Sequence, residues 1–214
     1  MKVIGDYDEG YALLQGLFPA EVCRAFLHRL KSDMDRAGIS LDRFASSSPI
    51  VKKTSVDISD ETYRPMVNFL WGLTPAISGV VGKRLLPTYN YFRLYQEGDV
   101  CLVHSDRESC EVSLTLTLAY SDGRPWPLDV GHARVEAQEP IKDDFGDDAF
   151  SSVEMQPGDA VLYQGVNRRH GRVSPNPNRW SAHMFLHWVD ADGPNAALAF
   201  DQRNAPPDVI DFSF

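Results

Sequence analysis

The stretch QPGDAVLYQGVNRRHGRVSPNPNRWSAHMFLHWV, residues 156–189, decides the fold of this chain. Its PGD triplet at 157–159 predicts a tight turn that starts the strand DAVLYQG, residues 159–165. An Asn- and Pro-rich turn follows, and a second strand, SAHMFLHWVD, covers residues 181–190. Because strands rich in β-branched and aromatic side chains alternate here with turn residues, the stretch favours an antiparallel β structure.

Two further strands lie upstream, YNYFRLYQ at 89–96 and VSLTLTLAY at 112–120. In the second of these, apolar and polar side chains alternate, as they do when one face of a sheet packs on an apolar core. The apolar face consists of Val112, Leu114, Leu116 and Leu118. The same alternation places Tyr120 on this face, together with the leucines.

The segment 121–152 is rich in Asp and Gly and is expected to be a long loop region. Within it, the run WPLDV at 126–130 predicts one more strand, whereas DDFGDDAF at 143–150 matches no regular element. Loops of this length in compact domains often serve as functional lids.

The first part of the chain predicts helices. Residues 18–37 carry apolar side chains at helical spacing until Gly38, which is typical of a helix end. A serine-rich loop with a short strand is expected at 39–56, and a second helical region, trimmed by its prolines, at 59–83. Helices followed by many strands predict a single α+β, mainly β, domain in which the helices support an antiparallel sandwich or barrel.

Composition limits the functions that the chain can have. The chain has 214 residues and a formal net charge of −9, which argues against a nucleic-acid partner because phosphate binding needs a basic face. Its three cysteines match neither a disulfide framework nor the spacing of a zinc site, so we expect a reducing compartment. No signal-peptide pattern and no apolar run long enough for a membrane span is present in the sequence, which predicts a soluble, cytoplasmic protein without a membrane partner.

The candidate metal ligands are His104, Asp106 and His170. On an extended strand, residues i and i+2 point the same way, so the imidazole of His104 and the carboxylate of Asp106 converge. A surface histidine beside a solvated aspartate explains this pair equally well when it is considered alone. With His170 after the PGD strand, however, the set becomes two histidines and one carboxylate. Such a set leaves positions open on iron(II) for a cosubstrate and dioxygen, whereas zinc usually takes four ligands, often including cysteine.

Arg179 and Ser181 supply a candidate site for a carboxylate. With His183 they share one face of the last strand, so their side chains are expected to point into the cavity that holds the metal. Arginine binds carboxylates in a bidentate fork, which suits this role. The alternative is a surface arginine that follows an Asn- and Pro-rich turn.

These motifs together resemble the iron(II)/2-oxoglutarate-dependent dioxygenase superfamily, and in particular its prolyl 4-hydroxylase-like branch. The resemblance covers residues 88–190 and implies a double-stranded β-helix, the jelly-roll or cupin-like core. Residues 1–87 would then be mainly helical support and 191–214 a C-terminal tail.

By this resemblance, the iron ligands are His104, Asp106 and His170, and Arg179 binds the distal carboxylate of 2-oxoglutarate. Ser181, Tyr95 and Tyr120 complete the cosubstrate pocket. The implied reaction is hydroxylation of a C–H bond in a small molecule or a peptidyl side chain, with O2 as oxidant and with decarboxylation of 2-oxoglutarate to succinate. The resemblance names neither the substrate nor an oligomeric state.

Three alternatives remain: an oxidative nucleic-acid demethylase of the same superfamily, a non-catalytic β-barrel metal-binding or sensor protein, and a cupin-type metal enzyme without a cosubstrate. Arg93 and Arg107, beside the HxD motif, are candidates for binding a substrate carboxylate, and salt bridges with Glu111 or Asp99 are the other interpretation. His183 and His187 are four residues apart, and core or pocket histidines are favoured over a second metal site.

Overall fold

The alternating strand β7 (Val112–Tyr120) divides the interior of the protein into two parts. In the computed structural model, which describes residues 1–202, its apolar side chains pack in the main hydrophobic core against two helices. Its polar side chains, Ser113, Thr115 and Thr117, lie on the opposite face and contact residues of the metal-ligand cluster and the space around it. The core therefore fills one side of the sheet, and the other side is left for a polar site.

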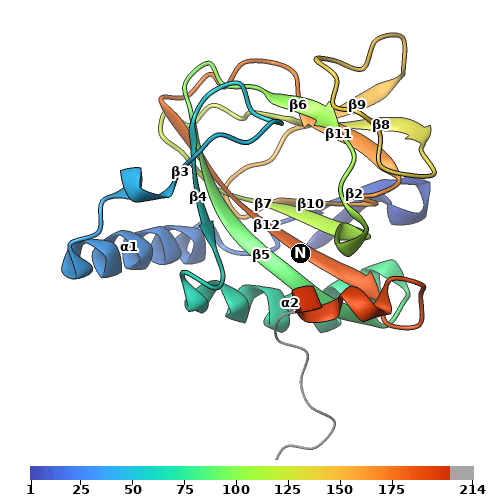
Figure 1. Cartoon of the computed structure of the whole chain (residues 1–214), viewed down its shortest axis with the longest axis horizontal. Coiled ribbons are helices and arrows are strands. Elements are labelled where there is room, and N and C mark those ends of the chain that lie inside the picture. Colours follow the sequence, from blue (N-terminus) through green and yellow to red (C-terminus); the bar gives the residue numbers. More distant parts are fainter. Residues whose placement is uncertain (203–214) are drawn as a thin grey trace, which may run out of the picture.

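Two antiparallel sheets build the fold (Figure 1). The larger contains eight strands in the order β1-β2-β10-β7-β12-β5-β4-β3. Besides β7, its strands are β1 (Lys2–Asp6), β2 (Tyr11–Gln15), β3 (Ala45–Ser46), β4 (Ser55–Ser59), β5 (Leu85–Gln96), β10 (Ala160–Tyr163) and β12 (Trp180–Asp190). The smaller sheet has the order β6-β11-β8-β9. Its strands are β6 (Cys101–His104), β8 (Leu128–Arg134), β9 (Phe150–Val153) and β11 (Arg168–Arg172). The sheets face each other as a jelly roll, which confirms the predicted fold class.

Helices α1 (Ala20–Ala37) and α2 (Val67–Val81) lie against the face of the larger sheet that points away from the smaller one (Figure 1). Each ends at a glycine in the left-handed conformation, Gly38 with φ 64° and Gly82 with φ 72°. Side chains with this φ are strained, whereas glycine adopts it freely, so both helices stop there. The first helix agrees with its predicted range. The second is shorter, because residues 59–66 end β4 and form a 3-10 turn.

The N-terminal hairpin of β1 and β2 was not predicted. Strand β2 pairs with β10 and so extends the larger sheet, while β1 forms its exposed edge. Helical support for the jelly roll is therefore confined to α1 and α2. The first fifteen residues belong to the sheet itself.

A β-bulge overturns the predicted face of Tyr120. Between β7 and β12, Ala119 pairs with Ala182 and Thr117 with His183, so Leu118 is the extra residue. Leu118 packs in the helix-side core, whereas Tyr120 packs with Tyr95 and Trp126 on the other face of the sheet. Simple alternation fails here because one inserted residue reverses the order of faces after it.

The segment that the sequence left unassigned, residues 143–150, has a structural role. Phe145 is 3% exposed, and its ring stacks on that of Phe150 with 4.5 Å between centroids. The expected loop region 121–152 thus contains β8 and the first residues of β9. The last described element is the 3-10 segment Ala196–Gln202, and the rest of the predicted C-terminal tail lies outside the described residues.

Candidate metal centre and its cavities

The three predicted ligands come together between the two sheets. His104 ends β6 and pairs directly with His170 of β11, and Asp106 follows two residues later. Oxygen Oδ1 of Asp106 lies 3.8 Å from Nε2 of His104 and 3.5 Å from Nε2 of His170. All three side chains are at least 85% buried. Backbone pairing of neighbouring strands, rather than a local motif alone, therefore completes the cluster.

Hydrogen bonds to the backbone orient both imidazoles. Nδ1 of His104 lies 2.7 Å from the carbonyl oxygen of Leu102, and Nδ1 of His170 lies 2.9 Å from that of Arg168. A carbonyl only accepts, so each Nδ1 carries the proton and each Nε2 offers a lone pair toward Asp106. Two imidazole lone pairs and one carboxylate oxygen that share a common space fit a divalent transition metal.

Asp106 is held by neighbours from two other elements. The Ser113 hydroxyl of β7 donates to its Oδ2 at 2.8 Å, and its backbone N–H donates to the carbonyl of Gly165 at 2.9 Å. Because Ser113 engages Oδ2, Oδ1 is the oxygen left to face the imidazoles. Within residues 1–202, a second group of side chains with metal-ligand spacing also uses Asp106, together with Cys110 and His187.

The pKa values of the three candidate ligands shift in different directions. Burial lowers the pKa of His170, but the Asp106 carboxylate outweighs this effect and raises it above its ordinary value. Burial raises the pKa of Asp106, but the nearby imidazoles, above all His170, outweigh this effect and hold its pKa well below the ordinary value. Burial and the proximity of His170 lower the pKa of His104 to about 4. At neutral pH the site therefore holds a carboxylate beside a neutral His104, which is the form that binds a metal.

A buried inner cavity adjoins the three ligands. Its walls are largely aromatic and apolar, and they include Tyr95, Cys101, Leu128, Tyr163 and Phe185. Two guanidinium groups also line it, those of Arg93 and Arg172. Apart from the metal ligand Asp106, no described residue brings a carboxylate to its lining, so the cavity favours an anionic occupant.

Arg172 lines this cavity and also contacts Trp126 and His183. The side chain is almost fully buried, with its Cζ 4.8 Å from the Trp126 ring centroid. Its Nη1 donates to the carbonyl of Trp126, and its Nη2 lies 3.4 Å from Nδ1 of His183. Within residues 1–202 no carboxylate forms an ion pair with it. Arg172 is thus a buried cation whose remaining N–H groups can serve an anionic ligand.

Arg179 does not point into the cavity, so this prediction was wrong. Its side chain is 70% exposed, and its Nε lies 3.3 Å from Asp122 at the surface. Arg179 precedes β12 and belongs to the turn, where the Asp122 carboxylate also accepts its backbone N–H at 2.8 Å. Alternation along a strand does not extend into a turn whose own hydrogen bonds set the direction of each side chain.

Of the three other predicted cosubstrate residues, one lines the inner cavity and two do not. Tyr95 lines the inner cavity, as expected. Ser181 is fully buried in β12, but its hydroxyl donates at 2.8 Å to Oδ1 of Asn176, in the turn before that strand. Tyr120 lies behind the cavity, where its hydroxyl donates to the Trp126 carbonyl at 3.4 Å. The structure therefore does not bring Ser181 or Tyr120 to the cavity lining.

An outer cavity of about 550 Å³ opens on the other side of the ligands and reaches the surface. Arg93 and Arg107 both line it, as the substrate prediction requires. Their acidic partners differ from those considered: Arg93 forms a bidentate ion pair with Asp57 at 2.7 Å, and Arg107 lies 3.1 Å from Asp201. Both arginines therefore line the outer cavity, which we call the mouth of the site, and each has its carboxylate partner beside it.

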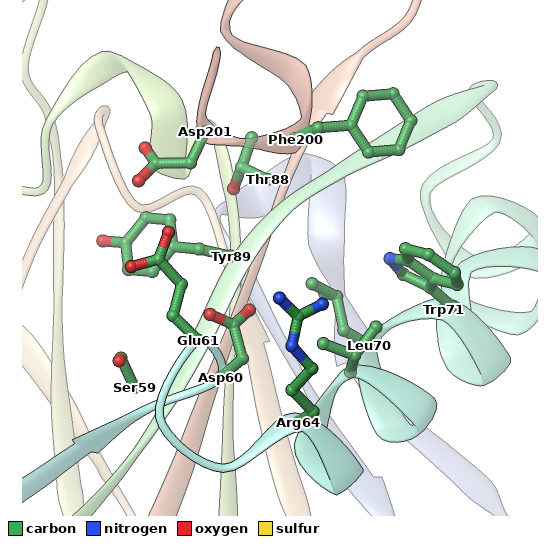
Figure 2. Close-up of a pocket in the computed structure, with 11 residues that line it drawn as sticks. Ser59, Asp60, Glu61, Arg64, Leu70, Trp71, Thr88, Tyr89, Phe200 and Asp201 are labelled. Atoms are coloured by element: carbon green, nitrogen blue, oxygen red, sulfur yellow. The ribbon is translucent and has the colours of Figure 1, made fainter. Parts of the chain in front are cut away.

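A side cavity of about 170 Å³ continues from the mouth toward α2 (Figure 2). It shares Ser59, Tyr89 and Asp201 with the outer cavity. Figure 2 shows the guanidinium of Arg64 in the middle of this space, with the Trp71 ring on the side of α2. A molecule larger than a single ring therefore has room beyond the mouth.

Sequence reasoning missed Arg172 and did not assign a role to Ser113 or His187. Arg172 follows His170 by two residues on the same strand, so alternation alone could have placed it beside the metal ligands. Ser113 and His187 come from β7 and β12, and no local sequence pattern predicts that they lie near Asp106. Only the pairing of these two strands brings them to the site.

Among residues 1–202, no helix has both the length and the apolar character that crossing a membrane requires. No protein-family model matches the sequence, and no curated protein does.

Several solved structures share this fold at low sequence identity. The alpha-ketoglutarate-dependent carbocyclase SnoK from nogalamycin biosynthesis is 13% identical, with a TM-score of 0.68 over 97% of this chain and 91% of that one. A Pseudomonas putida prolyl-4-hydroxylase is 17% identical, with a TM-score of 0.54 over 83% and 92%. HygX from Streptomyces hygroscopicus, solved with nickel, 2-oxoglutarate and hygromycin B, is 13% identical, with a TM-score of 0.60 over 87% and 85%. The fold is therefore the jelly roll found in non-haem iron, 2-oxoglutarate-dependent oxygenases.

Proposed function

We propose that this protein is an iron(II)- and 2-oxoglutarate-dependent oxygenase that hydroxylates a C–H bond of a small molecule. One observation carries the proposal: two histidines and one carboxylate open onto a buried cavity lined by the guanidinium of Arg172, which has no carboxylate partner within residues 1–202. Zinc sites usually use four ligands, whereas this set of three leaves room on a ferrous ion for a chelating cosubstrate and dioxygen.

The roles of the ligands follow from their surroundings. His104, Asp106 and His170 would hold the metal through two Nε2 atoms and Oδ1. When bound, ferrous iron with 2-oxoglutarate and O2 supplies the oxidising power needed to attack an unactivated C–H bond. Ser113 keeps Asp106 turned toward the imidazoles, and the aromatic walls of the inner cavity exclude water from the reacting centre.

Arg172 takes the role that the sequence had suggested for Arg179. It lines the inner cavity but not the mouth, so its free N–H groups lie where the distal carboxylate of a cosubstrate would be sheltered from water. A charge-assisted hydrogen bond in such a site contributes about 1.5–3 kcal/mol. Arg93 lines both cavities and is therefore better placed for the substrate than for the cosubstrate.

The size of the mouth favours a small molecule, and the structure of HygX with hygromycin B supports this choice. The solved structures with this fold include a carbocyclase as well as a hydroxylase, so the product must be identified by mass. Hydroxylation adds one oxygen atom, whereas ring closure removes two hydrogens. The three cysteines are free and buried, which supports the proposed cytoplasmic location.

The test compares Arg172→Met with Arg179→Met, two identical changes seven residues apart. Anaerobic iron(II) and 2-oxoglutarate should give a visible charge-transfer band with the wild-type protein, and its titration gives the Kd for 2-oxoglutarate. We expect Arg172→Met to raise this Kd at least about tenfold, which corresponds to about 1.4 kcal/mol. Arg179→Met should leave the Kd unchanged, because its guanidinium contacts only surface groups.

The outcomes separate the parts of the proposal. If the wild-type protein gives no charge-transfer band and His104→Ala also gives none, the proposed function is refuted. A band that depends on Arg179 but not on Arg172 would refute the assignment of the carboxylate site alone. Circular dichroism of both methionine variants checks that the fold is retained.

A further inference from the structure

We infer that the substrate is a hydroxyl-rich cyclic molecule, such as a sugar or a cyclitol, and that His187 and Arg93 bind hydroxyl groups at two edges of its ring. The inference rests on the proposed function, since it concerns the substrate of the same metal site. It starts from two residues that line the mouth: within residues 1–202, Nε2 of His187 has no hydrogen bond and the buried Nη1 of Arg93 has no acceptor.

The acceptor is Nε2 of His187, and a hydrogen-bond relay determines its state. The Ser113 hydroxyl has one proton, and it faces Oδ2 of Asp106 at 2.8 Å and the Cys110 carbonyl at 3.1 Å, which both only accept. Nδ1 of His187, 2.9 Å from the same hydroxyl oxygen, must therefore donate to it. In the neutral imidazole the proton is then on Nδ1 and Nε2 carries a lone pair, and for residues 1–202 no hydrogen bond to Nε2 is present.

The donor is Nη1 of Arg93. The Nε and Nη2 groups of Arg93 each donate to Asp57 at 2.7 Å, and this bidentate pair holds the guanidinium in one orientation. Its Nη1 is buried and has no acceptor among residues 1–202. A buried N–H group without an acceptor costs about 1–3 kcal/mol, so a ligand that supplies an oxygen there is stabilised.

Tyr91 separates the two groups. Residues 89, 91 and 93 alternate along one face of β5, and the Tyr91 ring lies 5.3 Å from Cζ of Arg93 and 6.1 Å from the ring of His187. The Tyr91 and His187 rings are close to parallel, at 21°, and Phe185 stacks on Tyr91 at 4.8 Å. The mouth thus has an aromatic surface with a donor at one end and an acceptor at the other. This arrangement fits the C–H face of a saturated ring whose edges carry hydroxyl groups.

Other substrate classes fit less well. A carboxylate can accept from Arg93 but cannot donate to His187, and an ammonium group can donate to His187 but cannot accept from Arg93. An apolar substrate would leave both groups unsatisfied. Among the described residues that line the outer cavity, Ile50 is the one aliphatic side chain, whereas Ser48, Ser59, Thr62 and Gln138 offer neutral hydrogen-bonding groups. A hydroxyl both donates and accepts, so a ring with several hydroxyls satisfies the whole lining.

The test uses the protein loaded with iron(II) and 2-oxoglutarate under anaerobic conditions. The probes are myo-inositol and methyl glucoside, with cyclohexanol as a ring that has a single hydroxyl and a proline-rich peptide as a different substrate class. Binding next to the metal is read as a shift of the visible band, and the Kd is measured by calorimetry on the nickel-loaded protein. We expect both polyols to shift the band at millimolar concentration, and cyclohexanol and the peptide to leave it unchanged.

Two variants of His187 separate substrate binding from structural support. His187→Asn keeps an N–H donor near Ser113 but removes the ring nitrogen that faces the mouth, and it should weaken polyol binding at least tenfold. His187→Gln places its amide near the position of Nε2 and should retain most of the affinity. The band of each variant is first recorded without a probe, so that an effect on Asp106 through Ser113 is separated from an effect on polyol binding.

The failure of this inference can be distinguished from failure of the proposed function. No band without any probe refutes the oxygenase assignment. Three results with a normal band would overturn the inference about the substrate and leave the oxygenase assignment standing. In the first, no polyol shifts the band. In the others, the peptide shifts it instead, or polyols shift it equally in wild type and His187→Asn.

Discussion

Gly165 shows how closely single residues are packed around the metal ligands. A Cβ added at this position would lie 2.3 Å from the Ser113 hydroxyl, 2.4 Å from the Cys110 carbonyl and 2.5 Å from Oδ2 of Asp106. The Cys110 oxygen is backbone, and the two side-chain oxygens are held by the hydrogen bond between them. The backbone of Gly165 must come this close because its carbonyl accepts the N–H of Asp106. A glycine at 165 is therefore a condition for the orientation of Asp106.

We expect Gly165→Ala to weaken metal binding at least tenfold, because the new methyl group displaces Asp106 or Ser113. Isothermal titration calorimetry with nickel measures the change in the Kd of the metal. Gly79→Ala is a matched control, since a Cβ at this helical position would have no neighbour within 4 Å. It should leave metal affinity unaltered and raise stability by about 0.5–1 kcal/mol. Unchanged metal affinity in Gly165→Ala would show that the site can relax around the methyl group.

At the scale of elements, the turn before β10 joins three parts of the chain. Oδ1 of Asp159 accepts the N–H of Gly16 at 2.7 Å, and Oδ2 accepts that of Gln156 at 2.9 Å. The backbone N–H of Thr117 in β7 donates to its carbonyl at 3.0 Å. The PGD motif thus starts a strand, as predicted, and also attaches the segment after β2 to the larger sheet.

Asp159→Asn should reduce the free energy of unfolding by about 1–3 kcal/mol, because an amide nitrogen cannot accept one of these two partly buried hydrogen bonds. Urea denaturation measures the loss. Asp144→Asn is the control: Asp144 also accepts a backbone N–H, from Gly146 at 2.9 Å, but in an exposed turn where water can replace it. Its effect should stay below about 0.5 kcal/mol. Equal losses in the two variants would mean that Asp159 does not connect the elements.

For the molecule as a whole, the candidate metal site brings together residues of the two sheets. His104 and His170 belong to the smaller sheet, whereas Ser113, which orients Asp106, belongs to the larger one. A ligand that binds only the folded protein stabilises it by mass action, by about 2.7 kcal/mol at a concentration one hundred times its Kd. For a chain of this length, that corresponds to a rise in Tm of roughly 5–10 °C.

Nickel should therefore raise the Tm of the wild-type protein by this amount, and a chelator should reverse the rise. Differential scanning calorimetry measures both steps without any need for turnover. His170→Ala should show no rise, since it removes one of the three ligands. A similar rise in the variant would indicate that the metal binds elsewhere on the folded protein.

Local sequence patterns were enough to predict several elements. Period-two alternation predicted β7, aromatic and β-branched side chains between turns predicted β12, and helical spacing up to Gly38 predicted α1. The HxD motif with a distal histidine predicted three candidate metal ligands, which the structure brings together. Such patterns are local because side-chain direction within a helix or a paired strand depends on the backbone of that element alone.

Tertiary structure decided what lies at the ends of strands and between them. The bulge at Leu118 turned Tyr120 to the other face, the turn before β12 sent Arg179 to the surface, and Arg172 took its place in the cavity. The relay from Asp106 through Ser113 to His187 exists only because β7 and β12 pair in one register. The physical reason is that pairing between strands and hydrogen bonds within turns bring together residues far apart in the chain, and no local pattern encodes which of them will meet.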